Sequence, residues 1–104
     1  MGIKNPTVSI DVNVTGANLT AGAASSNLAL PVDSAGNAPQ YVRVAMLPAT
    51  ACHIRFGGVA VAALATDTLI TGGDSVTFNT SGCTHAAVIQ EGTGGQVNVV
   101  PLAW

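Results

Sequence analysis

Alternation of apolar and polar residues with a period of two is the feature that most constrains the fold of this chain. Val8, Ile10, Val12 and Val14 are each separated by a polar residue, and the pattern returns in short runs from Tyr41 onward. Successive side chains of a strand point to opposite faces of a sheet, so the pattern predicts half-buried β-strands. We expect strands at Val8–Val14, Tyr41–Leu47, Ala51–Phe56, Val59–Leu64, Thr68–Ile70, Ser75–Asn79, His85–Gln90 and Gln96–Val100.

Glycine-rich turns separate these runs, at Gly57-Gly58, Gly72-Gly73, Ser81-Gly82 and Gly92–Gly95. Short strands with closely spaced turns predict an all-β fold, either an antiparallel β-sandwich or a jelly-roll-like barrel. No helix is expected, because the alanine-rich run at 59–65 follows a Gly-Gly turn and lacks helix caps.

Two of these turns predict hairpins. Positive φ at Gly57-Gly58 would form a type I′ turn, which pairs residues 51–56 with residues 59–64. With Glu91–Gly95 as a loop, Ile89 would oppose Val97, while Val88, Gln96 and Asn98 would face outward. In the first hairpin the core side would carry Cys52, Ile54 and Phe56 opposite Ala63, Val61 and Val59.

We expect a single domain with an amino-terminal strand and extended arm at residues 1–40 and a sandwich core at residues 41–104. From residue 17 to residue 40 the small Ala, Ser, Gly and Asn side chains offer little apolar surface to offset an ordering cost of roughly 1–2 kcal/mol per residue. Leu28, Leu30 and Val32 form an apolar strip that could add to the strand edge of a neighbour. We therefore expect the arm to reach an adjacent subunit or a larger assembly.

Charge excludes several classes of partner. Charged residues make up only 8% of the 104 residues, and the formal net charge is −2. Electrostatic binding of nucleic acid requires clustered Lys and Arg.

The longest apolar run, Val59–Ala65, is far shorter than the ~20 residues of a membrane helix, and no apolar run follows Lys4 as in an export signal. We expect no contact with nucleic acid or membrane, and reduced cysteines.

The cluster that most resembles a metal site consists of Cys52-His53 and Cys83-Thr84-His85. Zinc needs four converging ligands, and adjacent residues of a strand point to opposite faces. We therefore expect no metal, no other cofactor and free thiols, although a Cys52–Cys83 disulfide is geometrically possible between neighbouring strands. No nucleophile elbow surrounds any serine, and Asp67 and Asp74 lie at turns, so no enzymatic activity is expected.

The expected outward faces are small and nearly uncharged, which favours association with a partner. Ala60, Ala62, Val88 and Asn98 are assigned to these faces. Arg43 and Arg55 are either solvated charges or intersubunit contacts, and Trp104 either closes the core or inserts into a neighbour. The candidate interface residues are Arg43, His53, Arg55, Leu28, Leu30 and Trp104.

Several short patterns follow one another in the second half of the chain: Tyr41-Val42-Arg43, Ile54-Arg55-Phe56-Gly57, Leu69-Ile70-Thr71-Gly72 before Val76-Thr77-Phe78, and Ala87-Val88-Ile89 with Val97-Asn98-Val99. From Tyr41 to Val100 they resemble small structural proteins of tailed-phage virions. The resemblance implies a capsid decoration or cement protein without a cofactor, which forms a homotrimer on the major capsid protein. Such a protein is assembled in the host cytoplasm, lies on the capsid surface, and keeps the shell from rupturing through many weak neutral contacts.

Two alternatives stay open. In the same virion setting, a tail, neck or host-recognition component would bind a glycan with the loops Gly72–Ser75 or Glu91–Gly95, although aromatic residues make up only 4% of the chain. A different class is a small enzyme or metal-binding jelly roll that uses Cys52, Cys83 and His85.

Overall fold

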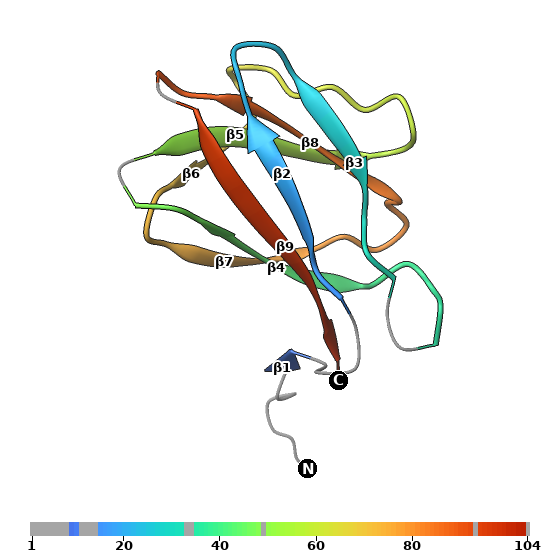
Figure 1. The fold of residues 1–104 in the computed structure, drawn as a ribbon. Coiled ribbons are helices and arrows are strands. Elements are labelled where there is room, and N and C mark those ends of the chain that lie inside the picture. The colour runs from blue at the N-terminus through green and yellow to red at the C-terminus, as the bar shows by residue number, and fades with distance from the viewer. Residues whose placement is uncertain (1–8, 11–14, 33–34, 49, 93, 104) are drawn as a thin grey trace.

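In the computed structural model, two antiparallel β-sheets pack face to face as a sandwich (Figure 1). The structure describes residues 9–10, 15–32, 35–48, 50–92 and 94–103. Within these ranges there is no helix long and apolar enough to cross a membrane. All the described elements are β-strands, which confirms the predicted all-β fold. The described strands are β1 Ser9–Ile10, β2 Ala17–Ala21, β3 Ser26–Ala29, β4 Tyr41–Met46, β5 Ala51–Gly57, β6 Thr68–Thr71, β7 Ser75–Asn79, β8 His85–Gln90 and β9 Gly95–Ala103.

The pairing of the strands makes the sandwich a jelly roll. The first sheet has the order β2-β9-β4-β7, with β1 beside the last residues of β9, and the second has the order β3-β8-β5-β6. The pairs are nested along the chain: β2 with β9, β3 with β8, β4 with β7 and β5 with β6. The chain thus folds like one long hairpin rolled around the core, and the β4–β9 and β5–β8 pairs close it into two sheets.

The core lies between the sheets and is built from alternate residues of the four central strands. Phe56 of β5 and Phe78 of β7 join the two sheets through a tilted ring contact with centroids 5.1 Å apart. Small β-branched side chains fill most of the remaining space, which suits closely packed sheets. The central-strand residues, each at most 5% exposed, are Val42, Val44, Met46, Cys52, Ile54, Ala86, Val88, Val97 and Val99.

Alternation located most of the strands correctly. The predicted ranges Ser75–Asn79 and His85–Gln90 match β7 and β8 residue for residue, and β4, β5 and β6 end within one residue of their predicted bounds. β9 is longer than predicted and continues to Ala103. Of the strand expected at Val8–Val14, only β1 is described, and the rest lies outside the described residues.

The expected extended arm is wrong for the described part of residues 17–40. β2 and β3 are strands of the sandwich itself, paired with β9 and β8. Leu19, Ala21 and Leu30 are buried in the core, and Leu28 packs against it. The physical reason is that backbone hydrogen bonds to strands far along the chain stabilise these short segments, so a low apolar content does not prevent them from folding.

Both predicted hairpins are also wrong, although the core side of β5 is confirmed. β5 pairs with β6 and β8, and residues 58–67 form a loop instead of a strand. Among the described glycines, the positive φ values that a type I′ turn needs occur at Gly36, Gly73, Gly82 and Gly92, not at Gly57 or Gly58. β8 and β9 lie in different sheets, so Val88 faces the core and is fully buried.

Candidate functional site

The two outer faces of the sandwich are where this fold can meet a partner, and one of them is covered. Residues 58–67, which we call the cover loop, join β5 to β6 and cross the outer face of the second sheet; the loop lies at the top of Figure 1. Asn27 of β3 donates its side-chain amide to the carbonyls of Val59 and Val61, at 3.0 and 3.2 Å. The Ala63 amide donates to the Ser25 hydroxyl at 2.8 Å. The loop is therefore tied to the sheet along its length.

A close fit accompanies these hydrogen bonds. Ala63 in the loop is 2% exposed, and Ala87 on the outer side of β8 is fully buried. A Cβ atom at Gly57 would lie 3.1 Å from Cγ2 of Val61, so the absence of a side chain lets the loop approach β5 closely. The outer face of the second sheet thus carries a small second core of its own.

His53 fastens the end of the cover loop. Its ring lies in the outer face of β5, where the residue is 8% exposed. Nε2 is 2.7 Å from Oε1 of Glu91, and Nδ1 is 2.9 Å from the carbonyl oxygen of Asp67. A carboxylate and a carbonyl oxygen only accept hydrogen bonds, so this geometry favours the imidazolium form, in which both ring nitrogens donate.

The environment of His53 agrees with this charge state. The hydrogen bond to Glu91 raises the pKa of His53 above its ordinary value of 6.5, and the bond to the Asp67 carbonyl adds to the rise. Arg55 lies beside the pair, with its Nε 3.8 Å from Oδ1 of Asp67, and Oδ2 of Asp67 accepts the Leu64 amide at 2.7 Å. The charged groups therefore hold together β5, the cover loop and the end of β8.

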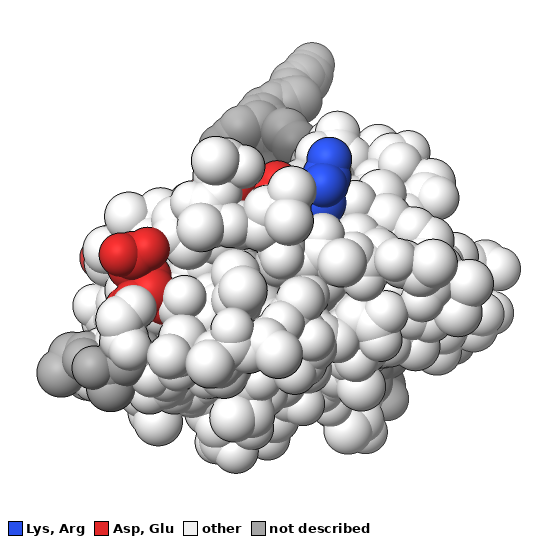
Figure 2. All heavy atoms as spheres, turned by 90° about the horizontal axis from the view of Figure 1, so that it is seen from above, with Lys and Arg blue, Asp and Glu red and all other residues white. Residues whose placement is uncertain are grey.

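The outward surface of the cover loop is apolar. Val59 is 75% exposed and Leu64 54%, and Leu69 on the adjoining β6 is 50% exposed. Between the loop and β5 lies an open hollow of about 480 Å³, with Arg55 at its edge. Figure 2 looks down on this side of the molecule and shows an almost uncharged surface with small, separate red and blue spots. This surface suits a protein partner better than a charged ligand.

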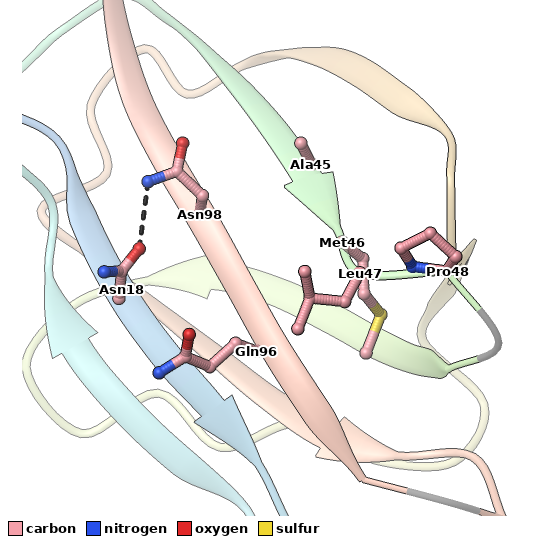
Figure 3. A pocket seen from close by; sticks show the side chains of 7 residues that line it. All are labelled: Asn18, Ala45, Met46, Leu47, Pro48, Gln96 and Asn98. Carbon is pink, nitrogen blue, oxygen red and sulfur yellow. Dashed lines mark hydrogen bonds between the residues drawn. The ribbon is translucent and has the colours of Figure 1, made fainter.

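The outer face of the first sheet is open and amide-rich. Asn18 of β2, Asn98 of β9 and Ala45 of β4 lie in one row across the sheet, and Nδ2 of Asn98 donates to Oδ1 of Asn18 at 2.9 Å. Beside this row lies a hollow of about 290 Å³. Figure 3 shows the carboxamides of Asn18, Asn98 and Gln96 on one side of it, with Leu47 and Pro48 on the other.

The candidate interface residues are scattered over the fold. Arg43 lies on the open face, half-buried, and its Nε is buried with no hydrogen-bond partner among the described residues. Arg55 has a side chain 52% exposed and borders the cover loop. His53 is buried under that loop, Leu30 is buried in the core and Leu28 packs against it half-buried, so within one copy of the protein these side chains offer little surface to a partner. Trp104 lies outside the described residues.

The residues of the metal or enzyme alternative do not converge. Cys52 faces the core, where burial raises the pKa of its thiol to about 11 and keeps it protonated at neutral pH. His85 lies on the opposite face of the same sheet, because Ala86 and Val88 are the core residues of β8. Cys83 is half-buried, and neither cysteine forms a disulfide. Over the described ranges there is no group of three or more His, Cys, Asp or Glu able to hold a metal.

The two loops of the glycan alternative use their polar groups within the fold. In the turn after β6, the Thr71 hydroxyl donates to Oδ2 of Asp74 at 2.6 Å, and the Gly73 amide donates to the Met46 carbonyl. In the loop after β8, Glu91 accepts from His53.

Sequence reasoning placed Gln96 and Asn98 outward correctly, but missed Asn18, whose partner lies on the last strand.

No family model, curated protein or solved structure matches the chain. A function therefore has to follow from the surface of the molecule.

Proposed function

We propose that this protein is a structural component of a tailed-phage virion, which decorates the outside of the capsid and stabilises the shell by docking through its cover loop. The observation that carries the proposal is a loop with only apolar residues at 59–65, tied by hydrogen bonds to the outer face of the second sheet. The resemblance of residues 41–100 to small virion proteins supports it, and so does the jelly roll, an architecture that viral capsid proteins use among others.

The exposed composition of the cover loop favours a protein partner. Between Gly58 and Thr66 every residue is Ala, Val or Leu, and Val59 and Leu64 are more than half exposed. Monomeric proteins rarely leave such a contiguous apolar surface in water. Burial against a capsid subunit removes it from water, with a gain of about 25 cal/mol per Å² of apolar area.

Rigidity of the loop lowers the cost of docking. Asn27, Ser25 and His53 fix the loop at its beginning, middle and end before any partner arrives. A preorganised surface loses less conformational entropy on binding than a mobile one. Many copies, each contributing a modest contact, can then stabilise a shell under pressure, and self-association into trimers would multiply the contacts of each docked unit.

Co-sedimentation with capsids of the parent phage, assembled without this protein, tests the proposal. The wild-type protein should pellet with the shells and should sediment as a trimer in analytical ultracentrifugation. Val59→Glu and Leu64→Glu should weaken capsid binding tenfold or more, because each buries a charge in an apolar contact. Val32→Glu is the matched control, since Val32 is 51% exposed outside the loop. Failure of the wild-type protein to bind any shell would refute the decoration role.

A further inference from the structure

The amide-lined hollow on the open face has no place in capsid docking. It lies on the outer face of the first sheet, whereas the cover loop lies on the outer face of the second. Docking through the cover loop would leave the hollow turned away from the shell and open to solvent. From its chemistry we infer that this hollow binds a neutral carbohydrate.

The hydrogen-bonding capacity of the hollow matches hydroxyl groups. The bond from Asn98 to Asn18 uses one amide hydrogen of Asn98 and the carbonyl oxygen of Asn18. It leaves the amino group of Asn18 to donate and the carbonyl oxygen of Asn98 to accept, at the two ends of the bonded pair (Figure 3). Adjacent hydroxyls of a sugar both donate and accept, so they can satisfy this pair together. The carboxamide of Gln96 adds a third group of the same kind.

The lining of the hollow offers no charged group to a ligand. Its residues are Asn18, Ala45, Met46, Leu47, Pro48, Gln96 and Asn98, none of which is ionisable. A phosphate or carboxylate would find no cation there, and a metal ion or an amine would find no carboxylate.

The hollow also has an apolar side. Leu47 is 56% exposed and stands with Pro48 opposite the amides (Figure 3). Pyranose rings carry hydroxyls at their edges and C–H groups on their faces, so an amide row facing an apolar wall fits both. Ala45 between them keeps the space open, because a larger side chain at this position of β4 would fill it.

Titration of the full-length protein with sugars, followed by NMR of the side-chain amides, tests this inference. The probes are glucose, galactose, mannose and N-acetylglucosamine, with glucuronic acid and inorganic phosphate as charged comparisons. At least one neutral sugar should give saturable shifts at the amides of Asn18 and Asn98, with a dissociation constant of about 1 mM, as expected for a ligand of this size. The charged probes should bind more weakly.

Variants locate the site. Asn18→Ala and Asn98→Ala should each weaken binding about five- to tenfold, as expected for a lost hydrogen bond. Thr77→Ala is the control, since Thr77 is exposed on the outer side of β7, two strands from the amide row of β9. Thermal unfolding shows whether each variant is folded, and a sugar-binding loss in a folded Asn98→Ala protein supports the site.

Two outcomes would overturn the inference and leave the decoration role intact. One is the absence of saturable shifts with every neutral sugar at high concentration. The other is protection of the Asn18 and Asn98 amides by bound capsids, without sugar binding, which would make the hollow part of a docking surface instead.

Discussion

The two outer faces of this sandwich are formed by similar strands, but one is covered by a loop and the other is open to solvent. Both carry alanine at a central position, Ala87 on β8 and Ala45 on β4. Ala87 is fully buried beneath the cover loop, whereas Ala45 stays partly exposed beside a hollow. The difference shows that the outer surface of a β-sandwich is decided less by its strands than by where the connecting loops go.

The polar groups also differ between the covered face and the hollow, although the open face carries Arg43 away from the hollow. The covered face holds an imidazolium between a carboxylate and a carbonyl oxygen, beside an arginine. The polar groups that line the hollow on the open face are neutral carboxamides. The groups of the first set are already bonded to one another, whereas the second set faces solvent and retains capacity for a ligand.

A charge placed under the cover loop should give the largest difference in stability between the two faces. Ala87→Asp would bury a carboxylate where the loop excludes water. Arg55 lies directly opposite on β5, but the cost of removing the carboxylate from water exceeds the gain from that pair, and we expect the free energy of unfolding to fall by about 3–5 kcal/mol. Ala45→Asp, the matched substitution on the open face, should cost less than about 1 kcal/mol. Urea unfolding measures both, and equal losses would show that the two faces do not differ in accessibility.

Replacement of His53 should cause the next largest loss of unfolding free energy. His53→Leu keeps the ring volume approximately but removes both hydrogen bonds, and we expect a loss of about 2–3 kcal/mol. Hydrogen exchange should accelerate at the amides of residues 61–67. His85→Leu is the control, because His85 is half-buried and bonds only to the Thr84 hydroxyl among the described residues. Unchanged exchange in His53→Leu would contradict the role of His53 in holding the loop.

The pH dependence of stability follows from the same ring. Because the folded state raises the pKa of His53 above 6.5, its stabilising contribution is complete below that value and is lost as pH rises through the higher folded pKa. Stability measured from about pH 6 to pH 9 should therefore fall toward the alkaline end. Glu91→Gln should flatten this fall, because a carboxamide can donate to a neutral ring. A wild-type stability that rises across this range would contradict the charged state of His53.

The smallest losses of stability should come from exposed asparagines, Asn27 at the start of the cover loop and Asn18 on the open face. Asn27→Ala removes two hydrogen bonds from an exposed amide and should cost about 0.5–1.5 kcal/mol, with faster exchange confined to residues 58–63. Asn18→Ala on the open face removes one exposed hydrogen bond and should cost less than about 0.5 kcal/mol. An Asn18 variant less stable than the Asn27 variant would contradict the inference that side-chain hydrogen bonds stabilise the covered face more than the open face.

Local pattern predicted strands well and their partners poorly. β7 and β8 were found residue for residue because alternation is a property of neighbouring residues. β2 was missed because its partner β9 lies at the other end of the chain, and Asn18 pairs with Asn98 across a separation of 80 residues. A glycine pair after β5 looked like a hairpin turn, yet the chain left the sheet there and returned as β6.

Residue types and their spacing along the chain were enough to predict the all-β class, the core side of β5 and the low charge of the surface. Three features are seen only in the folded molecule: the nested pairing of the strands, the covering of one face by residues 58–67, and the contact of Asn18 with Asn98 on the other face. These features depend on contacts between distant segments, where backbone hydrogen bonding is nearly independent of side-chain type. Competition among alternative pairings is therefore settled by how the whole core packs.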